Sequence, residues 1–172
     1  QTESPLLQEI IETTDRELEY SNMLTNRMVG KFLQILIKLG GYRRILELGL
    51  FTGYSALTMA ESLPEDGEVI SLEMNERYEN MARSFIDRSD HGHKVKIVMG
   101  MAQDTLPEQE GPFDMAFIDA DKANYPTYYD MILPMIPRNG IIVVDNAFWD
   151  GDVLGPDGEK GQAVDELNKK IR

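Results

Sequence analysis

The stretch ILELGLFTGYS, residues 45–55, decides the fold. A hydrophobic run reaches the carboxylate of Glu47, and Gly49 and Gly53 follow before Ser55 closes the segment. A buried strand that runs into a glycine turn and then into a helix is a building unit of open α/β sheets. The two glycines allow the backbone to approach a ligand closely, because they carry no side chain that would block it.

Outward from this segment, strand and helix patterns alternate five times along the chain. We expect strands at residues 44–48, 68–73, 94–100, 113–120 and 140–146. We expect helices at residues 4–20, 25–41, 54–62, 75–89, 102–106 and 128–136, and a last helix from about residue 162 to the chain end. This alternation predicts an α/β fold with a mostly parallel sheet and helices on both faces.

Length and composition predict a single domain over residues 1–172, with 42% apolar residues available for its core. N-terminal helices cover about residues 4–39, and the α/β core covers about residues 43–172. A net charge of −13 disfavours broad binding of nucleic acids, because it repels their phosphates. The chain has no cysteine for disulfides or thiolate metal sites, and no apolar run long enough to span a membrane. We therefore expect a cytoplasmic protein.

The two N-terminal helices carry start and stop signals. Ser4 and Pro5 fit the N-cap and the first position of the first helix. Thr25 is a candidate cap of the second helix, and Gly40–Gly41 should end it. Helical spacing places an apolar set on one face of this second helix: Met28, Phe32, Ile35, Leu36 and Leu39.

Carboxylates stand at the ends of four of the five expected strands. They are Glu47, Glu73, Asp119 and Asp145. The carboxyl ends of parallel strands meet at one edge of the sheet, and ligands of open α/β sheets bind beyond that edge. We therefore expect a functional cluster there, rather than four unrelated solvated acids.

The glycine turn has the pattern E-x-G-x-x-x-G, which lacks the third glycine of dinucleotide-binding turns. Glu47 would also repel a pyrophosphate, so a cationic ligand suits this turn better. Glu73 at the next strand end suits the hydroxyls of a ribose. A nucleoside with a positive charge meets both conditions, and S-adenosylmethionine is such a molecule. The alternative is a tight strand–helix turn with two acids that bind nothing.

The last two strand ends offer oxygen ligands from Asp119, Asp145 and Asn146. Without histidine or cysteine in the set, a hard cation is favoured over zinc. Three protein oxygens leave room for the two oxygens of a vicinal diol. Lys122 follows three residues after Asp119, and a neighbouring cation would lower the pKa of this lysine toward the range of a general base. The alternatives are a solvated loop lysine and an ordinary turn.

Three segments together carry a resemblance to a known family. They are ILELGLFTGYSALTMAESLPEDGEVISLE, FIDADKANYPTYY and GIIVVDNAFWDG. The sequence resembles the cation-dependent O-methyltransferases: the caffeoyl-CoA type, its bacterial relatives and, more distantly, catechol O-methyltransferase. The likeness extends upstream through MLTNRMVGKFLQIL and covers nearly the whole chain. It implies a Rossmann-like class I methyltransferase fold.

The resemblance also implies roles for individual residues. S-adenosylmethionine would contact Met23, Thr25, Glu47, Gly49, Ser55, Glu73, Ala102 and Asp121. A divalent cation, expected to be Mg with Mn or Ca as alternatives, would be held by Asp119, Asp145 and Asn146. Lys122 matches the lysine thought to act as the base in the catechol enzyme. The acceptor would contact Asp119, Lys122, Trp149 and Asp150.

The chain departs from the family pattern at two places. Asp150 stands where plant members have an asparagine that touches the substrate, and this change, with the net charge of −13, argues against an acyl-CoA acceptor. The family continues past the last helix into two further strands, the last antiparallel, and we expect both to be missing from this chain. The resemblance implies a homodimer, with the N-terminal helices as candidates for the contact.

The sequence therefore predicts methyl transfer from S-adenosylmethionine to a hydroxyl of a small vicinal-dihydroxy aromatic acceptor, with help from a divalent cation. One alternative acceptor is a hydroxylated uridine in tRNA, which would need a basic patch formed by Arg43, Arg44 or Lys31. Another alternative is a non-enzymatic module that binds a nucleotide or metabolite, such as an NAD-binding Rossmann protein. The missing third glycine and Glu47 disfavour NAD.

Overall fold

Strand β1 (Arg44–Leu48) is the middle strand of a five-stranded parallel sheet. The computed structural model of the protein describes residues 3–172. The other strands are β2 (Glu68–Glu73), β3 (Val95–Met99), β4 (Met115–Ile118) and β5 (Ile141–Val144). Their spatial order is β3-β2-β1-β4-β5, so the chain reverses its direction of winding between β1 and β4. In such sheets, ligands bind at this switch point.

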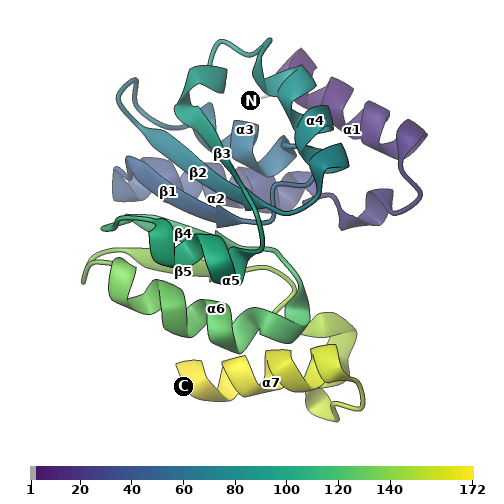
Figure 1. Cartoon of the computed structure of the whole chain (residues 1–172), viewed down its shortest axis with the longest axis vertical. Coiled ribbons are helices and arrows are strands. Elements are labelled where there is room, and N and C mark those ends of the chain that lie inside the picture. Colours follow the sequence, from purple (N-terminus) through teal and green to yellow (C-terminus); the bar gives the residue numbers. More distant parts are fainter. Residues whose placement is uncertain (1–2) are drawn as a thin grey trace.

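Helices cover both faces of the sheet (Figure 1). The first face is covered by α1 (Pro5–Glu17), α2 (Arg27–Gly40), α3 (Tyr54–Ala60) and α4 (Glu76–Ile86). The second face is covered by α5 (Ala102–Thr105), α6 (Tyr125–Ile132) and α7 (Glu159–Ile171). The predicted α/β architecture is confirmed, including a parallel sheet between two helical layers.

The alternation of side chains along β1 and β4 divides the core into two layers. Ile45 and Phe117 pack with residues of α2 and α3, whereas Leu46, Leu48 and Ile118 pack with residues of α6 and α7. Neighbouring residues of a strand point to opposite faces, so Glu47 shares the face of Ile45. This register places a carboxylate inside the layer that α3 covers.

Several predicted element ends moved by a few residues. The helix expected at 128–136 begins at Tyr125 and ends at Ile132, with Pro126 in its first turn, where a proline costs no hydrogen bond. The last helix begins at Glu159, before the expected residue 162. The strands expected at 113–120 and 140–146 are each shorter, since β4 covers Met115–Ile118 and β5 covers Ile141–Val144.

Helix α2 confirms one predicted signal and contradicts another. Gly41 ends the helix in a left-handed conformation, as expected. The N-cap is Asn26, whose side chain accepts from the backbone of Met28 and Val29, so the expectation that Thr25 caps the helix was wrong.

The apolar set that we placed on one face of α2 is largely exposed. Exposed fractions are 82% for Met28, 52% for Phe32, 53% for Ile35 and 82% for Leu39. The buried face is instead formed by Gly30, Leu33 and Ile37. Gly30 lets α3 pack closely, because a Cβ at this position would lie 3.1 Å from the hydroxyl of Tyr54.

The N-terminal helices are tied to the glycine turn. The hydroxyls of Thr14 in α1 and Thr52 in the turn share a hydrogen bond of 2.8 Å, and both side chains are fully buried. Ser4, the predicted N-cap of α1, accepts from the backbone of Leu7 and donates to Glu61. Within residues 3–172, none of the helices is both long and apolar enough to cross a membrane.

Candidate active site

The glycine turn after β1 fits against the end of β4. Gly49 has a φ of 96°, and a Cβ there would lie 2.5 Å from the carbonyl oxygen of Asp119. Gly53 has a φ of 87° and precedes α3, where a Cβ would lie 3.1 Å from Ala82. The turn therefore approaches another part of the protein closely, and Gly49 also lines the cavity described below. This close approach brings the switch point and the end of β4 together.

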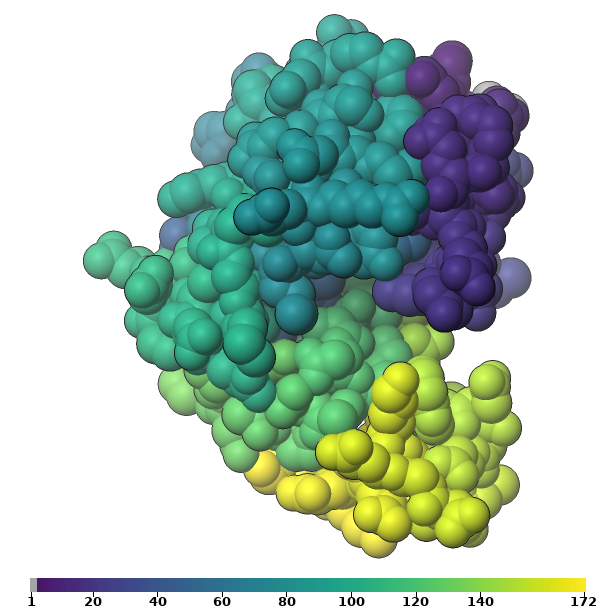
Figure 2. All heavy atoms as spheres, turned by 45° about the vertical axis from the view of Figure 1, so that its right-hand side comes forward, coloured from purple at the N-terminus to yellow at the C-terminus, as the bar shows by residue number. Residues whose placement is uncertain are grey.

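A cavity of about 740 Å³ lies beyond the carboxyl ends of the strands. This volume falls in the range of small-molecule sites. Its walls come from the N-terminal segment 22–26, the strand ends and the C-terminal loop around Asn146, Trp149 and Lys160. Figure 2 shows the surface indented between the purple N-terminal segment and the yellow-green C-terminal part.

Backbone strain concentrates at this cavity. In the described part of the chain, four residues other than glycine have a positive φ: Phe51, Asn146, Trp149 and Asp150. All four line the cavity. Such conformations cost free energy and persist where the surrounding structure enforces them, which is most often at functional sites.

Glu73 closes the cavity at the end of β2. One carboxylate oxygen accepts from the backbone of Phe51 at 2.9 Å, and the other accepts from Met74 at 2.9 Å and Asn75 at 2.8 Å. The carboxylate thus joins the glycine turn to the loop after β2. Its two oxygens have about four acceptor positions in total, so capacity remains for a hydroxyl of a ligand.

Glu47 is fully buried and is not among the residues that line the cavity. Ser71 donates to its Oε2, while Oε1 has no partner. Burial raises the pKa of Glu47 to about 8, and the neighbouring hydroxyls of Ser71 and Ser55 oppose this shift. Ser55, at the start of α3, does line the cavity. The cofactor contact predicted for Glu47 stays a prediction.

Lys122 and Asp119 form an ion pair at the end of β4. The Nζ of Lys122 lies 2.8 Å from Oδ1 of Asp119, and their side chains are only 9% and 13% exposed. Nζ also donates to the hydroxyl of Tyr125 at 2.6 Å. Thr25 donates to the other oxygen of Asp119 at 3.3 Å, which ties the N-terminal segment to the same carboxylate. A solvated loop lysine does not describe Lys122, because this residue is buried.

The three predicted cation ligands, Asp119, Asp145 and Asn146, all line the cavity. Burial raises the pKa of Asp119, the charge of Lys122 opposes this shift, and the charge of Asp145 adds to it. The two carboxylates are therefore close enough to repel each other, and a cation between them would relieve the repulsion. Over the described residues, no group of three histidine, cysteine or acidic side chains gathers for a metal. The predicted ligands Asp119, Asp145 and Asn146 are not such a group, because Asn146 is an amide. Their oxygen atoms fit a hard cation.

The structure brings most of the remaining predicted residues to the same cavity. Met23, Thr25, Gly49, Ser55, Glu73, Ala102, Asp121, Trp149 and Asp150 all line it. Asp121 is held there by Tyr128 and Asn124, which both donate to its carboxylate. The prediction that these residues surround one site is consistent with this arrangement, and their individual contacts with ligands stay predictions.

Sequence reasoning missed several residues of the site, among them Tyr125, Tyr128 and Lys160. Tyr128 and Lys160 line the cavity, and Tyr125 holds Lys122 from behind it. A signal for the tyrosines was present, because Asp119, Lys122, Tyr125 and Tyr128 follow one another at intervals of three. Lys160 lies 5.8 Å from the ring centroid of Trp149, a contact between distant loop positions that spacing does not reveal.

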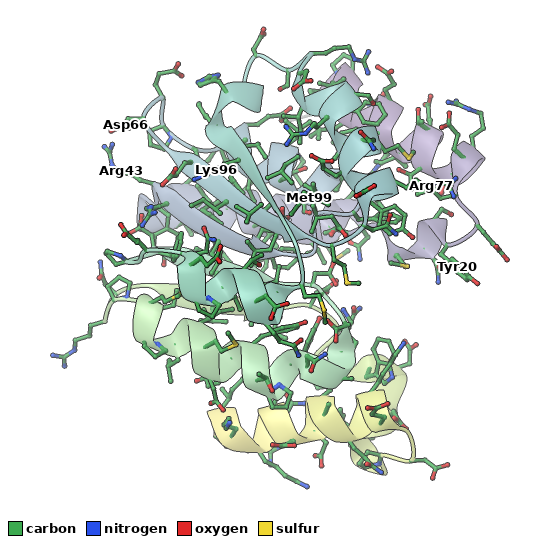
Figure 3. The ribbon with its side chains drawn as sticks, in the orientation of Figure 1. Tyr20, Arg43, Asp66, Arg77, Lys96 and Met99 are labelled. Carbon is green, nitrogen blue, oxygen red and sulfur yellow. The ribbon has the colours of Figure 1, made fainter. Side chains whose placement is uncertain are left out.

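The opposite end of the sheet carries structural ion pairs. Arg43 pairs with Asp66, and the two lie together at the far side of the sheet from Tyr20 (Figure 3). Arg44 pairs with Glu68 at 2.6 Å. The basic patch that a tRNA acceptor would need from these arginines is therefore neutralised by neighbouring acids, and it faces away from the cavity.

Comparison with known proteins decides the family. A sequence model of the O-methyltransferase family matches residues 1–172. The chain belongs to the O-methyltransferase family. Among curated members, it is 39% identical over 141 residues to caffeoyl-CoA O-methyltransferase 2 of Zea mays, covering 78% of this chain and 53% of that protein. It is 38% identical over 164 residues to a probable caffeoyl-CoA O-methyltransferase of Arabidopsis thaliana, covering 88% and 71%. The chain thus spans between half and three quarters of these relatives.

Solved O-methyltransferase structures share the fold throughout the chain. The O-methyltransferase TomG of Streptomyces achromogenes, in complex with SAM, aligns with a TM-score of 0.92 at 31% identity. That alignment covers 98% of this chain and 78% of TomG. An O-methyltransferase of Bacillus cereus, in complex with SAH, aligns with a TM-score of 0.89 at 31% identity, over 99% of this chain and 80% of that one.

Proposed function

We propose that this O-methyltransferase transfers a methyl group from S-adenosylmethionine to one hydroxyl of a small aromatic acceptor with two adjacent hydroxyls, assisted by a divalent cation. One observation carries the proposal. Asp119, Asp145, Asn146 and Lys122 line the same cavity as the glycine turn and Glu73. Donors for a hard cation, a buried lysine and a nucleoside-binding edge therefore meet in one space.

The methyl donor would lie along the ends of β1 and β2. Glu73 has acceptor capacity for a ribose hydroxyl, and Gly49 and Ser55 present backbone and hydroxyl groups on the same wall. Met23 and Thr25 close the site from the N-terminal side. The family's solved relatives in complex with SAM and SAH support this choice of donor.

The acceptor would lie between Lys122 and the C-terminal loop. When bound, the donor would supply its sulfonium methyl group to the acceptor oxygen and leave as S-adenosylhomocysteine. Asp119, Asp145 and Asn146 would hold a divalent cation, whose chemistry there would be Lewis acidity toward the acceptor hydroxyl. As a neutral amine, Lys122 would take up the hydroxyl proton at Nζ; as an ammonium, it would instead stabilise the oxygen anion. Trp149 and Asp150 line the same cavity and would orient the ring.

A screen of acceptors tests the proposal. The purified protein is incubated with S-adenosylmethionine, Mg²⁺ and one acceptor: catechol, a catechol carboxylate, phenol, caffeoyl-CoA or total tRNA. We expect methylated product from catechol and the catechol carboxylate and little from phenol, because phenol lacks the second adjacent hydroxyl. Product from tRNA or caffeoyl-CoA alone would contradict the proposed acceptor.

Neither alternative function has a matching observation. The arginines available for a tRNA site are paired with Asp66 and Glu68 at the other end of the sheet. A module that only binds a metabolite gives no reason for a buried lysine that is paired with the carboxylate of Asp119. Mg²⁺ is the proposed cation, with Mn²⁺ and Ca²⁺ as alternatives that an oxygen-only site also accepts.

We further propose that the protein forms a homodimer through α2. Met28, Phe32, Ile35 and Leu39 form an exposed apolar stripe along this helix. Contiguous apolar surface of this kind marks contact sites between proteins. A second copy is the proposed occupant, since the same stripe on both chains would be self-complementary about a two-fold axis.

A further inference from the structure

We propose that Tyr125 is a positioning residue for Lys122: its hydroxyl holds the ammonium group of the lysine and fastens it to the ends of β4 and β5. The inference rests on the proposed function, because it gives Lys122 its orientation in that reaction. The side chain of Tyr125 is fully buried, and the residue does not line the cavity. It therefore acts through Lys122 and not on a ligand.

The hydroxyl of Tyr125 both accepts and donates hydrogen bonds. The hydroxyl accepts from Nζ of Lys122 at 2.6 Å. Its own hydrogen points to the backbone oxygens of Ile118 at 3.2 Å and Asp145 at 3.3 Å. Ile118 is the last residue of β4, and Asp145 directly follows β5. One hydroxyl thus connects the lysine to both strands that carry the proposed cation ligands.

The local backbone explains why these side chains meet. Lys122 begins the short 3₁₀ helix Lys122–Asn124, and Tyr125 follows it as the first residue of α6. Side chains three residues apart lie on the same side of a 3₁₀ turn. Asp119 precedes Lys122 by the same interval and holds Nζ at 2.8 Å. The ammonium is therefore held between an acid before it and a hydroxyl after it.

The consequence for the reaction follows from counting donors. An ammonium group has three N–H donors. Asp119 and Tyr125 take one each, which leaves one for a ligand in the cavity that Lys122 lines. A lysine side chain is long and flexible, and a single partner does not fix its end. Without the tyrosine hydroxyl, Nζ could turn about its remaining bond to Asp119 and lose its position toward the acceptor.

The ring of Tyr125 also belongs to the core, where it packs among the residues beneath α6 and α7. The substitution Tyr125→Phe keeps this ring and removes only the hydroxyl. We expect kcat to fall roughly 10- to 100-fold, the effect of losing a hydrogen bond to a charged group. The KM for S-adenosylmethionine should stay near that of the wild type, because Tyr125 does not line the cavity.

A double-mutant cycle separates positioning from simple stability. Tyr125→Phe is compared in the wild type and in Lys122→Met, where the ammonium no longer exists. We expect the kcat loss caused by Tyr125→Phe to vanish in the Lys122→Met background. An equal fold loss in both backgrounds would overturn the proposal. Tyr128→Phe is the matched control, since this tyrosine bonds to Asp121 instead, and its effect should be the same in both backgrounds.

The same double-mutant cycle can be measured by thermal unfolding, which tests the contact between Tyr125 and Lys122 without using the reaction. Tyr125→Phe should lower the midpoint more in the wild type than in Lys122→Met, because only the wild type loses a bond to the ammonium. Equal shifts would overturn the inference. If the wild type methylates no vicinal diol, the proposed function fails, and the unfolding cycle still decides whether Tyr125 holds Lys122.

Discussion

The ammonium nitrogen of Lys122 lies 2.8 Å from Oδ1 of Asp119, in a buried ion pair at the mouth of the switch point between β1 and β4. The Gly49 turn fits against the backbone of the same aspartate. The residues that would bind the donor and those that would act on the acceptor therefore share one structural support. Substitutions at Lys122 should therefore change turnover, whereas substitutions on the donor-binding wall should change the affinity for S-adenosylmethionine.

Lys122→Met should lower kcat by about 10²- to 10⁴-fold, the usual contribution of a positioned acid–base group. The affinity for S-adenosylmethionine, measured by calorimetry, should remain close to that of the wild type. Lys31→Met is a suitable control, because Lys31 lies on α2 and donates to Gln34 outside the cavity. An unchanged kcat across the pH range would remove Lys122 from the mechanism.

Asp145→Ala should abolish the stimulation of methyl transfer by Mg²⁺ while sparing much of the affinity for the methyl donor. The physical reason is the loss of one of three proposed oxygen ligands, beside a carboxylate that it repels. Calorimetric titration with Mg²⁺ measures the binding directly. Asp130→Ala is the control, since Asp130 lies on α6 and pairs with Lys170. Full activity of Asp145→Ala in chelator would refute the role in cation binding.

Glu47→Gln should make stability less dependent on pH. The folded state holds a proton on Glu47 up to a pKa of about 8, whereas an unfolded glutamate releases it near 4.5. Between these values the unfolded state binds fewer protons, so this group lowers the free energy of unfolding as the pH rises. Glu47→Gln should remove this loss, which is on the order of 4 kcal/mol at pH 8.

Denaturant unfolding of Glu47→Gln at pH 5 and pH 8 checks this expectation. The mutant should gain stability relative to the wild type mainly at the higher pH. Glu12→Gln, at an exposed position of α1, serves as the control and should show no such gain. An equal difference between Glu47→Gln and the wild type at both pH values would show that the buried carboxyl does not carry the proton.

Gly49→Ala should destabilise the protein and distort the cavity. The new Cβ would meet the carbonyl oxygen of Asp119 at 2.5 Å, and the φ of 96° disfavours any side chain. We expect a loss of about 3 kcal/mol or more in the free energy of unfolding. Gly41→Ala separates the two causes, because Gly41 has a φ of 64° with nothing near its Cβ position, and should cost only about 1 kcal/mol. Equal losses for both would contradict the close contact with β4.

Charges on the exposed stripe of α2 should prevent self-association. Met28→Glu combined with Leu39→Glu places two carboxylates on surface that is 82% exposed at both positions. Sedimentation equilibrium should show a dimer for the wild type and a monomer for this variant. Leu154→Glu is the control, since Leu154 is 92% exposed but lies on another part of the surface. A monomeric wild type would contradict the proposed dimer.

The order of the helices and strands could be predicted from the sequence, because apolar residues recur at different intervals in helices and in strands. The carboxylates at the strand ends were found for the same reason: parallel strands end at one edge. The spacing of Met28 and Leu39 placed them on one apolar face of α2, but it did not show that this face is exposed. Only tertiary packing, through Gly30, Leu33 and Ile37, shows which side of this helix is buried.

The partners of individual side chains depended on the structure. The register of β1 turns Glu47 into the layer beneath α3, next to Ser71, a neighbour that spacing along the chain does not indicate. Thr25 was expected to cap α2 and instead bonds to Asp119, 94 residues away. Contacts between distant segments leave no periodic signal, whereas the interval of three from Asp119 to Lys122 and Tyr125 does.

The most direct measurement is methyl transfer to catechol by the purified protein, followed by mass spectrometry in paired samples that contain either Mg²⁺ or a chelator. We predict that O-methylated catechol forms with Mg²⁺, stops forming in chelator, and forms again when excess Mg²⁺ is restored. Equal product in both samples would contradict a cation site at the ends of β4 and β5.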